Sequence, residues 1–457
     1  MSIPEETSTA GKALLARTSW ATELASILPL STFIDFVNLT LRLHVFELNG
    51  SAPMWCWLIT PASSRVLLSS KYLEDHCYLD RYTTDRWHCL DGRYGDWYDL
   101  ASPKTIMLGL SSQYMQIISN ESSAMISGGR KVQNLTVVHV TRNWAVADEE
   151  HGLLHFFQEQ GWRYWIISAL GWLLWVASIT AAVFLECYLA LTFLLVIVAS
   201  GCLIWSMYGF RQRHLLIDNP HSLRRLVITT RHMNETNWIV YYGESQTINS
   251  LLNLPLKPRG SPRSPATYVV LRAVLRVLIV GQWALALAAA STRDWNAYFI
   301  AFWIAICIVS QSYLLNPSLA ARDWMRNLGI DMKAFKTKLS SRHSLLNTIV
   351  ALNPDTFVWD DDNGQHDYTR VEKESFAWID PILKTCQDRS RWEEATVQVM
   401  KKVAGEDTDT IVSDTGLQYL LRLLNGDWVT EYGREKWSQS ILEGIHMAAK
   451  IKSVANL

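Results

Sequence analysis

The chain has 457 residues, of which 49% are hydrophobic and 19% charged, and its formal net charge is −1. This composition is apolar for a soluble protein and polar for a pure transporter, so we expect membrane helices joined to water-exposed domains. The near-zero charge excludes a general attraction to nucleic acid. The seven scattered cysteines do not suggest a secreted disulfide framework, and residues 1–15 lack the pattern of a signal peptide.

Residues 1–160 are predicted to form a small cytosolic domain of mixed α/β structure. In the stretch FVNLTLRLHVFEL, residues 36–48, apolar and polar side chains alternate. A period of two is typical of a half-buried strand, so we expect a strand here. The stretch TVVHVT, residues 136–141, predicts a second strand on the same grounds.

Residues 161–210 are predicted to form a first transmembrane hairpin. The apolar run from Tyr164 to Phe210 is too long for one crossing, which needs about 20 residues. We expect two helices, at about 164–184 and 188–209, with Glu186 at the turn between them. The alternative, one long helix with a buried Glu186, would project far beyond the bilayer.

Residues 211–267 are predicted to form a cytosolic connector. The stretches LVITT (226–230) and WIVYY (238–242) read as short strands joined by a turn at NETN, and a short helix is expected through INSLLNL. The stretch PLKPRGSPRSP, residues 255–265, is rich in Pro, Gly and Ser and is predicted to be a linker.

Residues 268–315 are predicted to form a second transmembrane hairpin. Its first helix should begin near Val269 and its second should span about 295–315, with Arg293 and Asp294 at the turn. Arg272 and Arg276, in the opening turns, would reach the lipid headgroups. Residues 316–457 are predicted to form a cytosolic helical domain.

Basic residues cluster beside the outer ends of both hairpins and are scarce at the two turns. Because cytoplasmic loops are rich in Lys and Arg, every large soluble part is predicted to be cytosolic in a multi-pass integral membrane protein. The chain has N-x-S/T sequons at Asn38, Asn120, Asn134 and Asn234. Glycosylation or chance explains them, and this topology favours chance.

Three carboxylates, Asp360, Asp361 and Asp362, stand together in VWDDDNGQHDY. Clustered carboxylates suggest a divalent metal and a diphosphate substrate. However, neither a D-D-x-x-D motif nor an EF-hand loop fits the spacing, so a solvated acidic turn is the preferred interpretation. No metal and no cofactor is therefore expected.

Two His-Cys pairs, His76–Cys77 and His88–Cys89, lie within 18 residues of sequence. Zinc uses such ligands, but adjacent side chains point in different directions and zinc sites prefer gaps of two to four residues. Buried cytosolic thiols are the preferred interpretation.

The predicted membrane helices contain few polar side chains, notably Gln282 and Gln311, and no ionisable residue at a helix midpoint. Ion-coupled carriers usually keep such a residue there. We therefore expect an anchor, or a lipid-facing site for an apolar substrate, with Gln282 and Gln311 forming hydrogen bonds between helices.

Three stretches, RHMNETNWIVYYGESQTINSLLNLPL, GQWALALAAASTRDWNAYFIAFWIA and SSRHSLLNTIVALNPDTF, resemble predicted fungal multipass membrane proteins of unknown function over about residues 150–395. This resemblance implies no catalytic residues and only a link to specialised metabolism. The stretch SSRVLLSSKYLEDHCYLDRY, with WHCLDG after it, resembles the tail of heterokaryon-incompatibility domains, although the W-T-x-Q-E segment expected upstream is replaced by MWCWLITPASSR.

These observations favour an integral membrane accessory or scaffold protein whose partners are the lipid bilayer and a protein bound through the cytosolic domains. The first alternative is a membrane-bound, cyclase-like enzyme acting on a prenyl-type substrate, with aromatic side chains around a cation and Asp360–Asp362 at the rim. The second alternative, an incompatibility or signalling module, depends on the N-terminal resemblance alone.

Overall fold

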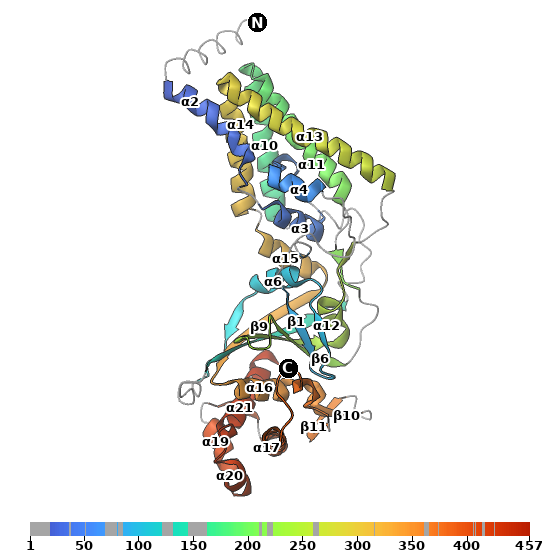
Figure 1. Cartoon of the computed structure of the whole chain (residues 1–457), viewed down its shortest axis with the longest axis vertical. Coiled ribbons are helices and arrows are strands. Elements are labelled where there is room, and N and C mark those ends of the chain that lie inside the picture. Colours follow the sequence, from blue (N-terminus) through green and yellow to red (C-terminus); the bar gives the residue numbers. More distant parts are fainter. Residues whose placement is uncertain are drawn as a thin grey trace. The chain divides into compact units, whose positions relative to one another are not determined.

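A computed structural model of the chain (Figure 1) divides into two compact units. The helical unit comprises Met1–Tyr82, Glu149–His214 and Leu256–Asn327, and the sheet unit comprises Thr83–Asp148, Leu215–Pro255 and Leu328–Leu457. The residues that the structure describes are 19–35, 38–50, 52–68, 80, 86–120, 131–144, 162–209, 213–216, 223–258, 265–314, 316–360, 365–372, 374–404, 406, 408–413, 416–424 and 426–457.

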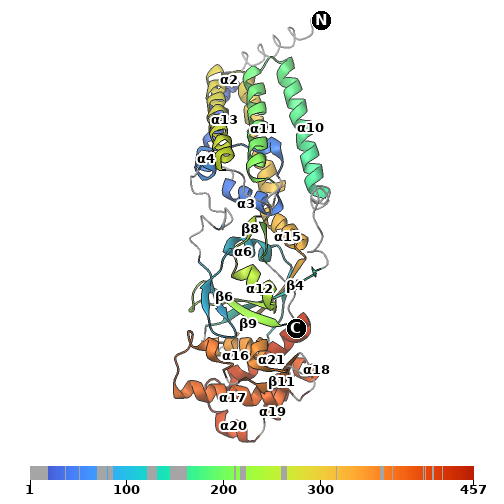
Figure 2. The ribbon, with the colours of Figure 1, turned by 90° about the vertical axis from the view of Figure 1, so that its right-hand side faces the viewer.

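Four long helices dominate the helical unit: α10 (Trp162–Phe184), α11 (Tyr188–Tyr208), α13 (Pro265–Thr292) and α14 (Trp295–Val309). All four are long and apolar enough to cross a membrane, which confirms that part of the predicted fold. Helix α11 packs along α13 and also contacts α10 and α14 (Figure 2). Apolar side chains such as Leu173 and Val277 are exposed on the outer faces.

The second hairpin begins earlier and ends earlier than predicted. Helix α13 starts at Pro265, because proline suits the first turn of a helix, where its missing N–H is not needed. Helix α14 ends at Val309 and continues as one π-helical turn, η3 (Ser310–Leu314).

The N-terminal part of the helical unit contains helices where a strand was predicted. Its elements are α2 (Ser19–Ile27), the 3-10 helix η1 (Leu28–Phe33), α3 (Leu39–Asn49), the 3-10 helix η2 (Met54–Cys56) and α4 (Pro61–Leu68).

Helix α3 replaces the strand predicted over residues 36–48, and that prediction was wrong. Asn38 caps the helix by accepting a hydrogen bond from the Leu41 N–H, and Gly50 ends it in the left-handed conformation at φ 69°. Arg42, His44 and Glu47 are buried, whereas the apolar Leu41 and Val45 are only half-buried. The polar residues of this helix therefore do not mark its exposed face, so the alternation of residue types carried no information about period.

The sheet unit contains a seven-stranded sheet in the order β2-β1-β6-β7-β4-β9-β3. Its strands are β1 (His88–Asp91), β2 (Trp97–Asp99), β3 (Met115–Ile117), β4 (Gln133–Arg142), β6 (Arg224–Thr230), β7 (Asn237–Glu244) and β9 (Ile330–Leu339). Neighbours pair antiparallel except β7 with β4 and β9 with β3, which are parallel. The strands predicted at 136–141, 226–230 and 238–242 are present.

The sheet takes its strands from three separate parts of the chain. Strands β1–β4 lie before the first long helix, β6 and β7 lie between α11 and α13, and β9 follows α14. Two short pairs, β5 (Arg213–His214) with β8 (Lys257–Pro258) and β10 (Phe357–Asp360) with β11 (Gln365–Val371), complete the strands.

Helices α12 (Ser245–Leu252), α16 (Arg342–Leu352) and α21 (Ser438–Ala455) pack against the sheet. Helices α17 (Gln387–Val403), α18 (Thr408–Val412) and α19 (Gly416–Leu423) pack on α21. The sheet unit also contains α6 (Pro103–Ser111), α20 (Asp427–Tyr432) and the 3-10 turns η4 (Pro354–Thr356) and η5 (Ala377–Ile379), whereas α15 (Pro317–Asn327) belongs to the helical unit. The α-helical C-terminal region agrees with the prediction, apart from β9–β11.

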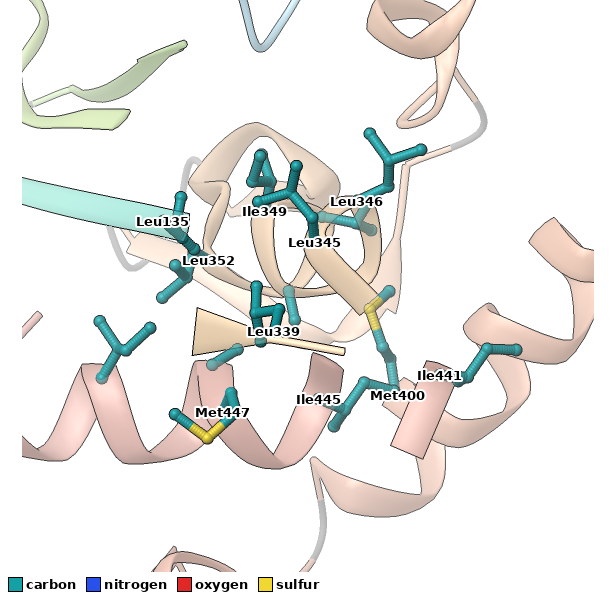
Figure 3. Close-up of a cluster of buried hydrophobic side chains, with 14 of the residues drawn as sticks. Leu135, Leu339, Leu345, Leu346, Ile349, Leu352, Met400, Ile441, Ile445 and Met447 are labelled. Carbon is teal, nitrogen blue, oxygen red and sulfur yellow. The ribbon is translucent and has the colours of Figure 1, made fainter. Parts of the chain in front are cut away.

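A hydrophobic core lies between the sheet and the C-terminal helices. Leu135 of β4 and Leu339 of β9 lie near Leu345 and Ile349 of α16, and Ile445 of α21 lies below them (Figure 3). At about 25 cal/mol per Å² of apolar surface removed from water, a fully buried leucine stabilises the fold by roughly 2 kcal/mol. This core holds the separate chain segments together.

Candidate functional site

The most polar feature inside the helix bundle is a stretch of non-helical backbone, residues 53–60, which we call the inserted segment. It contains the 3-10 turn η2, and the rest is irregular. Trp55, Trp57 and Ile59 are almost completely buried, and they pack against α11, α13 and α14. Backbone polar groups buried this deeply must find hydrogen-bond partners within the protein, because an unpaired buried group costs free energy.

Gln282 of α13 supplies partners for two groups of this backbone. Its Oε1 accepts from the Ile59 N–H at 3.2 Å, and its Nε2 donates to the Trp57 carbonyl at 3.4 Å and to the Ser200 hydroxyl of α11 at 2.9 Å. Gln282 was predicted to bond between helices. It does so through Ser200, and it also holds the inserted segment.

Three further side chains of the bundle donate to carbonyl groups of the inserted segment. Gln311 Nε2 donates to Cys56 O at 2.8 Å, Trp303 Nε1 to Trp55 O at 3.3 Å and Trp283 Nε1 to Ile59 O at 2.9 Å. Four carbonyl groups of the segment, those of residues 55, 56, 57 and 59, thus receive side-chain donors. The sequence predicted Gln311 as a membrane-interior polar residue, but its partner is the segment.

Two glycines make room for the inserted segment. A Cβ at Gly171 of α10 would lie 2.0 Å from the Trp55 ring, and a Cβ at Gly201 of α11 would lie 2.2 Å from the Met54 carbonyl oxygen. Both distances are far below van der Waals contact, so glycine allows the close approach.

Arg42 of α3 reaches the same segment from its own helix. Its Nη2 donates to the Cys56 carbonyl and lies 2.7 Å from the Cys56 sulfur, and its guanidinium lies 4.2 Å from the Trp57 ring centre. Within the described residues its Nε and Nη1 have no hydrogen-bond partner. Arginine keeps its charge, so the aromatic face and the carbonyl stabilise a buried cation here.

Glu47 of the same helix forms a buried ion pair with Arg213 of β5. Glu47 Oε1 is 2.8 Å from Arg213 Nη2, and Arg213 also donates to the Leu256 carbonyl at 2.9 Å. Burial, and then the charge of Arg213, lower the pKa of His44 to about 3. His44 therefore stays neutral at physiological pH, and the pair ties α3 to residues at both ends of the connector.

The predicted tip residues lie at the two turns of the hairpins. Glu186 has φ 53° and Arg293 has φ 51°, which closes each turn in the left-handed region. Asp294 caps α14 by accepting from the Asn296 N–H at 3.0 Å. The Asn296 Oδ1 in turn accepts from the Ala190 N–H of α11 at 3.0 Å, so the second turn also caps the helix of the first hairpin. Arg293 is exposed.

Of the three carboxylates Asp360, Asp361 and Asp362, the structure describes only Asp360. Asp360 ends β10 and pairs with Gln365 across a hairpin, while Asp361 and Asp362 lie outside the described residues. In the described parts of the chain, no three His, Cys, Asp or Glu side chains form a group suited to a metal ion.

The pair His76–Cys77 lies outside the described residues. In the pair His88–Cys89, the two side chains lie in different environments. His88 Nδ1 is 2.8 Å from Asp99 Oδ1 on the neighbouring strand, whereas Cys89 is fully buried. Adjacent strand residues point to opposite faces of a sheet. Burial, and then the charge of Asp99, raise the pKa of the Cys89 thiol, which makes it unreactive.

Sequence reasoning missed the inserted segment and Arg42. The stretch MWCWLIT, residues 54–60, has the aromatic and apolar character of a buried strand, and Pro53 and Pro61 flank it. These prolines were a usable signal for non-helical buried backbone. Arg42 gave no usable signal, because it was assigned to the polar face of a strand.

No family model, curated protein or solved structure matches this chain.

Proposed function

We propose that this protein is an integral membrane accessory or scaffold protein. Its four long helices anchor it in the bilayer, and its sheet unit remains in the cytosol. The observation that supports this proposal is that polar side chains within the bundle form hydrogen bonds with the protein's own backbone. Gln282, Gln311, Trp283 and Trp303 all bind the protein's own inserted segment, and Trp55 and Trp57 pack between the helices.

This arrangement favours an anchor over the alternatives. A carrier keeps ionisable groups facing a pathway, and a cyclase keeps its aromatic faces turned toward a substrate cation. Here Trp55 packs edge-on against Trp303 at 6.1 Å, and the Trp57 ring contacts Phe46 at 5.8 Å and the Arg42 guanidinium. The aromatic faces contact the protein itself.

Two measurements test the proposal. After alkaline carbonate washing of cell membranes, the protein should remain in the pellet; release into the supernatant would overturn the anchor. In purified vesicles, Gln282→Leu should lower thermal stability. A solute flux that the wild type supports and Gln282→Leu abolishes would instead show a carrier. Gly281→Ala, the neighbouring position with open space around it, is the matched control.

A further inference from the structure

Strand β3 forms one edge of the seven-stranded sheet and pairs on one side only, in parallel with β9. The Ile118 N–H donates to the Lys336 carbonyl of β9 at 2.9 Å. Successive residues of a strand direct their backbone groups to opposite sides, so the N–H and C=O groups of Met115 and Ile117 point away from β9. In the part of the chain that the structure describes, no strand pairs with this outer side of β3.

This edge lacks the features that usually prevent a sheet edge from pairing. Natural edge strands carry charged side chains or proline for that purpose. The stretch SSQYMQIISN, residues 111–120, contains neither. Tyr114 is 87% exposed and Ile117 is 80% exposed, whereas Ile118, on the other face of the strand, lies in the core. The edge therefore presents free backbone groups beside exposed apolar side chains.

Lysines lie beside this edge. Lys336 of β9 lies opposite Ile117 in the register of the two strands, and Lys338, two residues further on, points to the same face. Lys131 is exposed just before the start of β4, the other neighbour of β9. None of these three lysines forms an ion pair with a carboxylate of the described chain. The face of the sheet at this edge is therefore positively charged.

These observations favour one class of partner. An extended peptide that adds as a further strand would bond to the free backbone groups of β3. About 10 Å, two strand spacings, would separate it from β9, and a lysine and a glutamate side chain together span that distance. A second copy of the chain would instead bring lysines toward lysines. Acyl chains of lipids offer no hydrogen-bond partners to backbone groups.

We propose that β3 binds an extended acidic segment of another protein, which adds to the sheet as an eighth strand. Carboxylates on alternate residues of this segment face Lys336 and Lys338, and its backbone pairs with that of Met115 and Ile117. This inference rests on the proposed scaffold role, for which it supplies the chemical class of the partner.

The test measures the binding of fluorescein-labelled hexapeptides to the full-length protein in detergent, by fluorescence anisotropy. One peptide alternates glutamate with valine, and the other alternates lysine with valine. We expect the glutamate peptide to bind about tenfold more tightly, because the lysines of the edge attract it and repel the other peptide. Lys336→Glu combined with Lys338→Glu should reverse this preference. The matched control, Lys401→Glu combined with Lys402→Glu on the exposed side of α17, should leave it unchanged.

Ile117→Pro tests the backbone pairing. Proline removes the outward N–H and leaves the Ile118 N–H free to bond to β9. Ile117→Thr is the matched control, since threonine suits a strand and keeps the N–H. We expect Ile117→Pro to bind the glutamate peptide about fivefold more weakly than Ile117→Thr, and thermal unfolding checks that both variants are folded. The charge reversal leaves the backbone untouched, so it decides the matter if Ile117→Pro does not fold.

The other outcomes identify other partners. No binding of the glutamate peptide, or equal binding of both peptides, would overturn the proposal. So would disulfide crosslinking of two copies through Ile117→Cys, in a chain whose exposed Cys202 and Cys386 are replaced by serine, because the edge would then bind a second copy. Protection of that cysteine from a maleimide by phosphatidylserine vesicles, without peptide, would show a lipid partner instead. Alkaline carbonate washing does not involve this edge, so a failure here leaves the membrane anchor standing.

Discussion

Glu443 of α21 is a fully buried carboxylate that accepts hydrogen bonds on both of its oxygens. Its Oε1 accepts from the Ser340 N–H at 2.9 Å and from Asn120 Nδ2 at 2.7 Å, and its Oε2 accepts from the hydroxyls of Ser344, at 2.6 Å, and Ser340. Four donors suit an ionised carboxylate, which accepts only. These bonds tie α21 to α16 and to the end of β9.

Glu443→Gln should therefore be destabilising. The new amide group would place a donor against donors, and we expect a loss of about 2–4 kcal/mol in the free energy of unfolding. Denaturant unfolding of the detergent-solubilised protein, followed by circular dichroism, measures it. The exposed Glu374 provides the control, since Glu374→Gln should change stability by less than about 0.5 kcal/mol. Equal effects of the two changes would show that the Glu443 network is unimportant.

Two of the sequon asparagines use their side-chain amide nitrogens in hydrogen bonds of the fold. The Asn120 amide nitrogen donates to the Lys338 carbonyl as well as to Glu443. The amide nitrogen of Asn134, on strand β4, donates to the Asn237 side chain at 2.8 Å. Glycosylation attaches a sugar at this nitrogen, so a sugar at either position would break these hydrogen bonds.

Lys452 of α21 should make stability depend on pH. Burial lowers its pKa to about 8, below the value of about 10.4 for an unfolded lysine. Between pH 8 and 10.4 the unfolded chain binds more protons than the folded chain, so the free energy of unfolding should rise with pH. Below pH 8 both states are protonated, and the folded state bears the cost of the buried charge.

The comparison with Lys452→Met isolates this effect, because other groups titrate equally in both proteins. We expect Lys452→Met to be the more stable protein at pH 7, and the difference in unfolding midpoint should shrink toward pH 10. The opposite sign, with wild type the more stable at pH 7, would mean that contacts such as the one at 5.3 Å to the Phe357 ring outweigh desolvation.

At the scale of elements, the helices whose sequence pattern is local were predicted correctly, and those whose side chains bind distant parts of the chain were not. Helices α10 and α11 begin and end within two residues of prediction, because an apolar run between polar turns is a local property. Helix α3 was missed because Arg42 and Glu47 find partners outside the helix and His44 is fully buried, so their polarity did not mark a solvent face. The partners of Gln282 and Gln311 were missed because they are backbone groups more than 200 residues away.

Strand β9 shows a local signal that was present and not used. In IDMKAFKTKL, residues 330–339, charged and apolar side chains alternate at the start, and their burial follows the same alternation. The surrounding helical pattern concealed it. Its pairing with β4 over ten residues was beyond prediction, since the register depends on contacts between distant segments.

Gly171, which lies against the Trp55 ring of the inserted segment, provides a test of its packing. Gly171→Leu should push the Trp55 ring out of the bundle, and we expect a loss of about 2–4 kcal/mol in the free energy of unfolding, or failure to fold. Even Gly171→Ala should destabilise, whereas Gly281→Ala, in open space on α13, should be neutral or stabilise by about 0.5–1 kcal/mol. Thermal unfolding in detergent compares the three variants. Equal melting temperatures for Gly171→Ala and Gly281→Ala would argue against the close packing of the segment.

At the scale of the whole molecule, the sheet unit depends on all three of its chain segments. Strand β9 lies between β4 and β3, and α16 and α21 supply the opposite wall of the core (Figure 3). Removing residues 328–457 should therefore unfold residues 83–148 and 215–255. The four long helices should stay folded, because their contacts lie within the helical unit.

Limited proteolysis of the truncated and full-length proteins in vesicles measures this dependence. We expect cleavage throughout residues 83–148 in the truncated protein, and protection in the full-length one. A protease-resistant fragment of the truncated protein that retains residues 83–148 would show that the N-terminal strands fold without β9.

The position of β9 in the sheet has a consequence for biosynthesis. Roughly 190 residues, including both hairpins, separate the end of β4 from the start of β9. At 5–20 residues per second, β4 waits on the order of 10–40 seconds after its own synthesis before its antiparallel neighbour emerges from the ribosome. During that time its hydrogen-bonding edge is open to other chains. We expect cells to need a chaperone that holds this strand while the four long helices are being synthesised.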